Sequence, residues 1–224
     1  MFKQGAKAAF PVVMGYLGIG FAAGVVERAA GLSYAEILLI STVLYAGSAQ
    51  FVVTGMLTLG TPAPAIVLTV FFLNLRHLLL SAALAPALSA VPAWKNALLG
   101  LQLTDETFVV ASSRKPLPAA WMAGLNLAAW SAWAAANLAG AALSGYAGNV
   151  KALAFALPAM FAGLLVLQMR MHSPVRMVGV AAVAAVSGIA IHKLWPGPWA
   201  VVGATVLGAC VGLAIQRWKS APSS

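Results

Sequence analysis

The chain has 224 residues, of which 62% are hydrophobic and 8% are charged, and its formal net charge is +9. Its mean hydropathy is +0.94, whereas a soluble domain carries about 25% charged residues, which excludes a water-soluble globular fold. The basic residues are spread over short loops, which excludes a nucleic-acid-binding patch and is typical of a membrane protein. We therefore expect an all-α, polytopic integral membrane protein in contact with the lipid bilayer, because helices satisfy their own backbone polar groups there.

Eight apolar segments come close to the ~20 residues that a membrane-spanning helix needs. Short stretches containing Gly, Pro or Ser separate them, as expected for loops. We predict a single transmembrane domain over residues 1–224, built as a helical bundle of about seven or eight transmembrane or partly spanning helices. The segments cover approximately residues 10–26, 35–58, 63–90, 95–113, 118–143, 151–169, 174–191 and 197–216.

Charge placement relates the number of spans to the orientation of the chain. If all eight segments span and the N-terminus is cytoplasmic, the inner side carries eight basic residues and the outer side four, as the positive-inside rule requires. The fourth segment contains two acids and could fail to span, in which case every later loop changes side. Seven spans with an external N-terminus are then equally consistent. We expect a cytoplasmic N-terminus if eight segments span.

Small residues mark places where the predicted helices can approach one another. Gly20 and Gly24 in the first segment have the four-residue spacing of a helix–helix contact surface. Gly208 and Gly212 repeat this spacing in the last segment. Both pairs predict close packing, either within the chain or toward a partner.

The second segment contains the run Tyr45-Ala46-Gly47-Ser48-Ala49-Gln50-Phe51. Its small residues favour either close helix approach or local unwinding. The side chains of Ser48 and Gln50 could bind a zwitterion, and helix-end amides freed by unwinding could bind its carboxylate. Packing alone is the competing interpretation.

The third segment carries Arg76, its only formally charged residue, near its middle. A charge at the centre of a bilayer costs roughly 2.5–3.5 kcal/mol on insertion scales, so it usually faces a partner or a wet cavity. Asn74, His77 and Ser81 share a neighbouring helical face. These residues indicate a solute pathway. The alternatives are ordinary interhelical hydrogen bonds and a break in the helix at residues 74–77.

The fourth segment supplies possible counter-charges in Asp105 and Glu106. Continuous helical geometry would place Lys95, Gln102, Glu106 and Ser113 toward one side, with Asp105 at its edge. Ionised carboxylates facing lipid would be very costly, so we expect them to face protein, water or Arg76. The alternative is an amphipathic helix lying in the membrane interface.

The rest of the chain offers packing residues rather than enzyme motifs. A stripe on the fifth segment favours tightly packed aromatics over a pathway wall, and it consists of Asn126, Trp130, Trp133 and Asn137. No phosphate loop, dinucleotide fingerprint or paired metal-ligand motif occurs, and Cys210 lies alone in an apolar run. We expect no enzyme activity, no catalytic residue, no cofactor and no metal site.

Five motifs in a fixed order resemble one known family, AzlC, the large permease subunit of branched-chain amino acid exporters in bacteria. They are Pro11…Gly15-Tyr16…Gly20…Gly24, Tyr45-Ala-Gly-Ser-Ala-Gln-Phe51, Asn74-Leu-Arg-His77, Leu103-Thr-Asp-Glu-Thr-Phe108 and Phe155-Ala-Leu-Pro-Ala-Met-Phe161. The resemblance covers roughly residues 5 to 215. It departs from the family pattern at Ala154, where an aspartate often stands, and this position bears on substrate and coupling ion.

The resemblance implies a permease of the bacterial cytoplasmic (inner) membrane that exports leucine, isoleucine and valine, with methionine as a further candidate. It also implies a small hydrophobic AzlD-type partner subunit and secondary transport without ATP hydrolysis. We expect the pathway to be lined by Tyr45, Ser48, Gln50, Asn74, Arg76, His77, Asp105 and Glu106. Arg76 would hold the substrate carboxylate or pair with Asp105 or Glu106, one of which carries the coupling proton. The alternatives are a passive channel or facilitator for another small solute and a non-transporting scaffold subunit.

Overall fold

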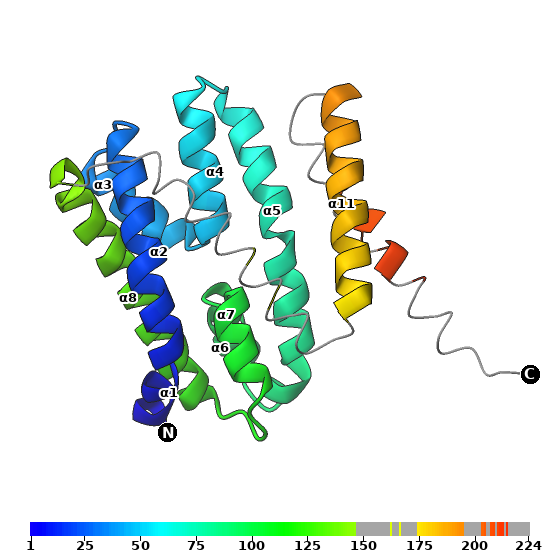
Figure 1. Ribbon diagram of the computed structural model, residues 1–224. Coiled ribbons are helices and arrows are strands. Elements are labelled where there is room, and N and C mark those ends of the chain that lie inside the picture. The colour runs from blue at the N-terminus through cyan, green and yellow to red at the C-terminus, as the bar shows by residue number, and fades with distance from the viewer. Residues whose placement is uncertain are drawn as a thin grey trace, which may run out of the picture. The chain divides into compact units, whose positions relative to one another are not determined.

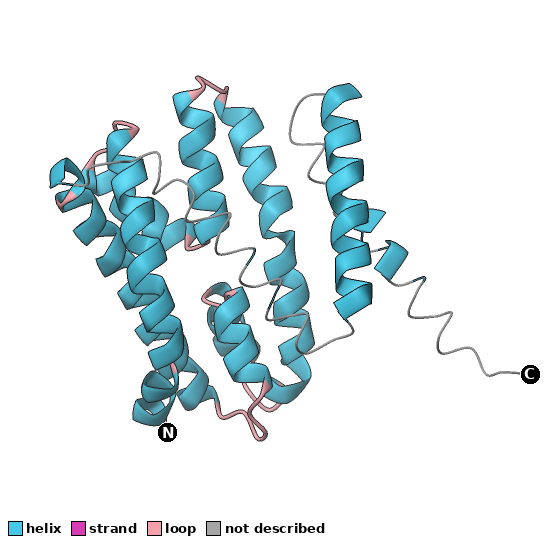
Figure 2. Ribbon diagram, in the orientation of Figure 1, coloured by secondary structure: helices cyan, strands magenta, loops and turns pink. Residues whose placement is uncertain are grey.

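The computed structural model describes residues 1–146 and 174–194, and single helical positions at 162, 166, 203, 204, 207, 208, 210–212 and 214. All regular structure in these residues is helical (Figure 2), which confirms the predicted all-α class. The chain divides into two compact units, Met1–Leu157 and Pro158–Ser224, so the single domain over 1–224 stays a prediction. The predicted segment 151–169, most of 197–216, Ala154 and the motif at 155–161 lie outside the described residues.

The first unit is built on two long parallel helices, α2 (Phe10–Ala29) and α8 (Ala119–Ala142), preceded by the short α1 (Phe2–Ala8). Figure 1 shows α2 and α8 side by side. A Cβ atom at Gly24 would clash with the backbone of Asn137, and Gly20 faces Ala136. The predicted Gly20–Gly24 contact surface is therefore confirmed, and α8 is the helix that it contacts.

The second predicted segment is not one helix but a hairpin of two half-helices. It consists of α3 (Tyr34–Leu39), the π-helical turn η1 (Ile40–Leu44) and α4 (Gly47–Thr58). The chain descends along α8 until the Thr42 carbonyl accepts from Trp130, then returns until Gln50 reaches Asn137. Tyr45 stands at the reversal in a left-handed conformation, with φ of 41°. Local unwinding, one of the two expectations for this stretch, is what the structure shows.

The fourth predicted segment is a second hairpin, which follows α5 (Ala63–Leu84) and the 3₁₀ turn η2 (Ala85–Leu88). Its arms are α6 (Ala93–Leu101) and α7 (Asp105–Ser112). Residues that precede the hairpin, such as Ala83 and Pro86, and residues that follow it, such as Arg114 and Lys115, line the same pocket of about 570 Å³. The hairpin therefore starts and ends on the same side. At about 1.5 Å per residue, neither arm could cross a hydrocarbon core about 30 Å thick.

This interruption corrects one sequence expectation. Lys95, Gln102, Glu106 and Ser113 do not lie on a single helical face, because the helix ends at Leu101 and restarts at Asp105. The break is held by packing of the hairpin tip: Leu103 is 1% exposed, and it joins a core with Leu99 and Leu125.

Within the first unit, each hairpin completes one of two similar repeats that run in opposite directions. Helix α2 is followed by a hairpin that enters from the end where α2 stops, and α5 is followed by a hairpin that enters from the end where α5 stops (Figure 1). The tips of both hairpins reach the middle of α5. Opposed repeats with interrupted helices that meet at mid-depth are typical of secondary transporters.

Two described helical stretches, Phe10–Ala29 and Ala63–Leu88, are long and apolar enough to cross a membrane. The 3₁₀ turn η3 (Ser144–Tyr146) follows α8. In the second unit, α11 (Pro174–Leu194) packs against the predicted glycine pair: Gly208 faces Ala184, and Gly212 faces Val180. That pair also forms a helix–helix contact, as expected.

Candidate functional site at Arg76

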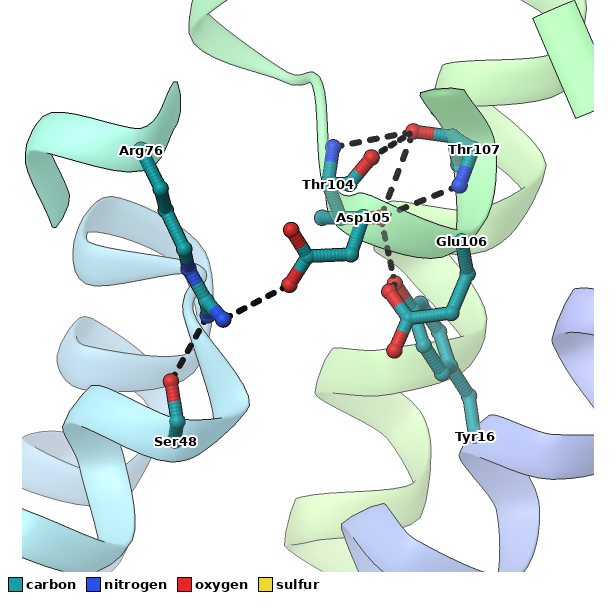
Figure 3. Close-up of polar contacts among 7 residues, drawn as sticks. All are labelled: Tyr16, Ser48, Arg76, Thr104, Asp105, Glu106 and Thr107. Carbon is teal, nitrogen blue, oxygen red and sulfur yellow. Dashed lines mark hydrogen bonds and ion pairs between the residues drawn. The ribbon is translucent and has the colours of Figure 1, made fainter. Parts of the chain in front are cut away.

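Arg76 lies on α5, the fourteenth residue of the 26-residue apolar stretch Ala63–Leu88, and its guanidinium joins the two hairpin tips. Nη2 donates to Ser48 Oγ at 2.7 Å, and Nη1 lies 2.7 Å from Asp105 Oδ2 in an ion pair (Figure 3). Helix α5 is continuous from Ala63 to Leu84, so the alternative of a break at residues 74–77 is wrong.

Both partners of Arg76 stand at the start of a half-helix. Ser48 is the second residue of α4, and Asp105 is the first residue of α7. Thr104 caps α7 by accepting from the Thr107 amide at 3.3 Å, while Thr107 Oγ1 accepts from the Thr104 amide at 2.9 Å. Helix N-termini carry partial positive charge and free N–H groups. A cation and two helix N-termini therefore converge on a place that favours an anion, and Asp105 fills this role here.

The second carboxylate, Glu106, has a different partner. Tyr16, which is 5% exposed on α2, donates from Oη to Glu106 Oε2 at 2.9 Å. The same Oη atom lies 2.7 Å from Thr104 Oγ1. Figure 3 shows Asp105 directed toward Arg76 and Glu106 toward Tyr16. Neighbouring acids thus serve separate purposes: one balances the arginine, and the other ties the α7 tip to α2.

The ion pair remains accessible. The side chains of Arg76 and Asp105 each retain 32% exposure, unlike the buried Ser48. Within the described part of the chain, Arg76 Nε and Asn74 Oδ1 are buried without a hydrogen-bond partner. Arg76 Nε is therefore an unused donor in the ion-pair site, whereas Asn74 lies two residues before Arg76 and thus about 200° around α5.

The remaining predicted pathway residues are only partly gathered here. His77 follows Arg76 on α5 and is half-buried, with no hydrogen bond to another described residue. Tyr45 is buried at the reversal of the first hairpin, and its Oη has no hydrogen-bond partner among described residues. The structure contradicts the expectation that Gln50 lines this site. Gln50 lies two residues beyond Ser48 and thus about 200° around α4.

Gln50 instead joins a fully buried polar network that the sequence pattern does not predict. Its Nε2 lies 3.0 Å from Glu27 Oε1, 3.3 Å from Ser41 Oγ and 3.3 Å from Asn137 Oδ1. Its Oε1 accepts from Trp133 Nε1 at 2.6 Å. The structure therefore confirms that the polar stripe of the fifth segment is a packing surface.

Tyr16 and Glu27 were missed, although the sequence carries a signal for Glu27. Glu27 falls just beyond the predicted first segment beside Arg28, where it resembles an interfacial residue. Helix α2 continues to Ala29, and Glu27 follows Gly20 and Gly24 at helical spacing on the face that contacts α8. An acid on a small-residue face is expected to be buried between helices.

Comparisons with known proteins bear on the family. A family model described as AzlC protein matches residues 11–147 of this chain, which include both hairpins and Arg76. The inner membrane protein YgaZ of Escherichia coli (strain K12) is 31% identical over 99% of this chain and 93% of its own. This chain belongs to the AzlC family.

Two other similar proteins are named by their location alone. A protein of Archaeoglobus fulgidus described as an uncharacterized membrane protein is 34% identical over 74% of each chain. One of the same description from Helicobacter pylori (strain J99) is 25% identical over 77% of this chain and 79% of its own. No solved structure matches. This AzlC protein is therefore a membrane protein, as its composition predicts.

Proposed function

We propose that this AzlC protein is the large subunit of a secondary exporter of branched-chain amino acids in the bacterial cytoplasmic membrane, working with a small AzlD-type subunit. Family membership and the membrane-protein relatives support a transport role. The observation that carries the proposal is the ion pair between Arg76 and Asp105, 2.7 Å long and half-way along an apolar helix.

An amino acid zwitterion can replace this ion pair charge for charge. Its carboxylate would bind Arg76 and Ser48 Oγ, close to the positive ends of α4 and α7. Its ammonium group would bind the carboxylate of Asp105. Because one opposite pair is exchanged for two, no unpaired charge is left at mid-depth, where it would cost several kcal/mol.

The same geometry provides competition between substrate and proton. Asp105 can hold either the substrate ammonium or a proton, but a protonated carboxyl no longer attracts the ammonium. A proton arriving from outside therefore releases the substrate, and the substrate arriving from inside displaces the proton. Exchange of this kind couples export to proton entry, with Asp105 rather than Glu106 as the carrier, since Tyr16 already donates to Glu106.

Apolar side chains around the charges suit an aliphatic substrate. Leu73 and Leu80 lie one turn before and one turn after Arg76 on α5, and both are half-buried. Contact with such side chains stabilises each buried methylene by about 0.8 kcal/mol. This favours leucine, isoleucine, valine and methionine over polar amino acids.

Efflux from bacterial cells loaded with branched-chain dipeptides tests the proposal. Cells with both subunits should lose leucine, isoleucine or valine faster than cells with either subunit alone, and an uncoupler should abolish the difference. Arg76→Ala and Asp105→Asn should each remove it while inserting normally. Efflux that ignores the uncoupler would indicate a facilitator. Variants that alter assembly but not kinetics would indicate a scaffold, and unchanged efflux in either variant would contradict the site.

A further inference from the structure

Glu27 is the most deeply buried acid of the described chain, and the site at Arg76 does not use it. Its side chain is 1% exposed at the interface of α2, α4 and α8. Gly24, one turn earlier on α2, touches the backbone of Asn137 and closes the space on the α8 side. Gln50 approaches from α4 and provides the hydrogen bond to Glu27 Oε1 at 3.0 Å.

The donors around Glu27 are too few for an ionised carboxylate. The indole N–H of Trp133 can only donate, so Gln50 Oε1 must face Trp133 and Gln50 Nε2 must face Glu27. That nitrogen has two hydrogens for three acceptors: Glu27 Oε1, Ser41 Oγ and Asn137 Oδ1. Glu27 Oε2 has no hydrogen-bond partner among the described residues.

No cation compensates Glu27 within the described part of the first unit. Helices α4 and α8 carry no ionisable side chain, and Arg28 is exposed, donating to the Leu32 carbonyl. The other titratable groups on α2 and the elements in contact with it are Lys3 and Lys7 of α1, Tyr16 of α2, Tyr34 and Glu36 of α3, Tyr45 after η1, Glu106 of α7 and Tyr146 of η3. None of them forms an ion pair with Glu27. Burying an isolated carboxylate costs far more free energy than burying a neutral carboxyl. A carboxylate in such a place therefore takes up a proton.

We propose that Glu27 is a second proton-binding site of this transporter: it holds a proton in the conformation described here and exchanges it as α4 moves during transport. The role in transport rests on the proposed function. The exchange is a simple acid–base step, in which the O–H bond at Oε2 breaks, water accepts the proton and the electron pair stays on the carboxylate.

Helix α4 provides the mechanical link between Glu27 and the substrate site. Its first turn holds Ser48 against Arg76 on one side and Gln50 against Glu27 on the other. The turn follows a π-helical stretch and the left-handed Tyr45, and both features are frequent at functional sites and switch regions. Substrate binding that pulls on Ser48 therefore changes the hydrogen bond that Glu27 Oε1 accepts from Gln50.

Infrared difference spectroscopy tests the protonation directly, because a protonated carboxyl has a carbonyl stretching band that a carboxylate lacks. The purified protein should show such a band at neutral pH, and Glu27→Gln should remove it. Glu36→Gln, the same change at an exposed cap, should leave it intact. Glu27→Asp should shift the band, which keeps the test decisive if Glu27→Gln folds poorly. A wild-type spectrum without the band, or a band that survives in Glu27→Gln, would overturn the proposal.

Transport by the two-subunit complex in lipid vesicles tests the coupling, with labelled L-leucine as the probe. Glu27→Gln should retain leucine–leucine exchange at equal pH but lose at least tenfold of the uptake driven by a pH gradient, and Glu36→Gln should retain both. Gradient-driven uptake at the wild-type rate in Glu27→Gln would overturn the coupling role. Absence of exchange in the wild-type complex would instead overturn the proposed function, and with it the coupling, while the infrared band still decides whether Glu27 binds a proton.

Discussion

At the scale of single residues, the guanidinium of Arg76 performs a task that one ammonium group cannot. Two different nitrogens contact Ser48 and Asp105, so the side chain holds both hairpin tips at once. Lysine carries the same charge on a single atom and lacks this fork. The chemistry of the site therefore depends on geometry as well as on charge.

Arg76→Lys should keep the protein folded but weaken leucine binding. Loss of one charge-assisted hydrogen bond costs about 1.5–3 kcal/mol, which corresponds to a roughly 10- to 150-fold rise in Kd. Isothermal titration of the purified protein measures this change. Wild-type affinity in Arg76→Lys would show that charge alone is sufficient.

Tyr16→Phe should destabilise the protein, because it removes the hydroxyl shared by Glu106 and Thr104. A buried polar group left without a partner costs about 1–3 kcal/mol, or about 2–4 °C in Tm for each kcal/mol. A thermal melt measures the change. Tyr34→Phe is the matched control, since Tyr34 is 48% exposed and its hydroxyl makes no hydrogen bond to a described residue. Equal melting of the two variants would contradict the structural role of Tyr16.

The residues of the site were predictable where their chemistry is rare in a membrane. Arg76 and Asp105 stand out because any charge at mid-depth is costly, and the structure joins them. Gln50 could not be assigned, because its partner depends on which way the first hairpin turns. Glu27 was missed because its position beside Arg28 is typical of an interface, although its spacing from Gly20 and Gly24 places it on the face of α2 that contacts α8.

At the scale of elements, the predicted segments within the described residues match the helical regions, although α2 extends to Ala29 rather than to residue 26. The interruptions inside two segments do not follow from the sequence alone. Loops with Gly or Pro separate α2 from α3, α4 from α5 and α7 from α8, as expected. The breaks at Tyr45 and at Gln102–Thr104 lie in runs that could continue as helix. Tertiary contacts decide them: Trp130 binds the Thr42 carbonyl, and Leu103 fills the core.

Gly24→Ala should loosen the contact between α2 and α8. The added Cβ would clash with the Asn137 backbone, and forced overpacking costs about 1–3 kcal/mol. Gly18→Ala is the same change on the same helix, with no atom within 4 Å of the new Cβ, and it should be neutral or slightly stabilising. Thermal melts of the pair measure the difference. Equal melting temperatures would contradict the packing of α2 on α8.

At the scale of the whole molecule, the two hairpins distribute the charges of the first unit between the two sides differently from eight full spans. Both arms of the second hairpin end on the side of the N-terminus, so Lys95 lies there with the basic loop after α7. Within residues 1–146, that side carries Lys3, Lys7, Lys95, Arg114 and Lys115, whereas the opposite side carries Arg28. This bias favours a cytoplasmic N-terminus more strongly than eight full spans do.

Cysteine labelling in a Cys210→Ser background tests this topology. Lys95→Cys and Lys115→Cys should react with an impermeant thiol reagent from the same side of the membrane, the cytoplasmic one, and Thr61→Cys from the other. Spanning of residues 95–113 would instead place positions 95 and 115 on opposite sides. Labelling of the two lysine positions from opposite sides would therefore contradict the second hairpin.

The measurement that most directly tests the site is binding of L-leucine and two analogues to wild-type protein, Arg76→Ala and Asp105→Asn. Leucinamide lacks the carboxylate, and isocaproate lacks the ammonium group. In the wild type both analogues should bind at least tenfold more weakly than leucine. Leucinamide should show little further loss in Arg76→Ala, and isocaproate little further loss in Asp105→Asn, because the deleted groups are partners. Equal, additive losses for every combination would contradict the replacement of the Arg76–Asp105 ion pair by a zwitterion.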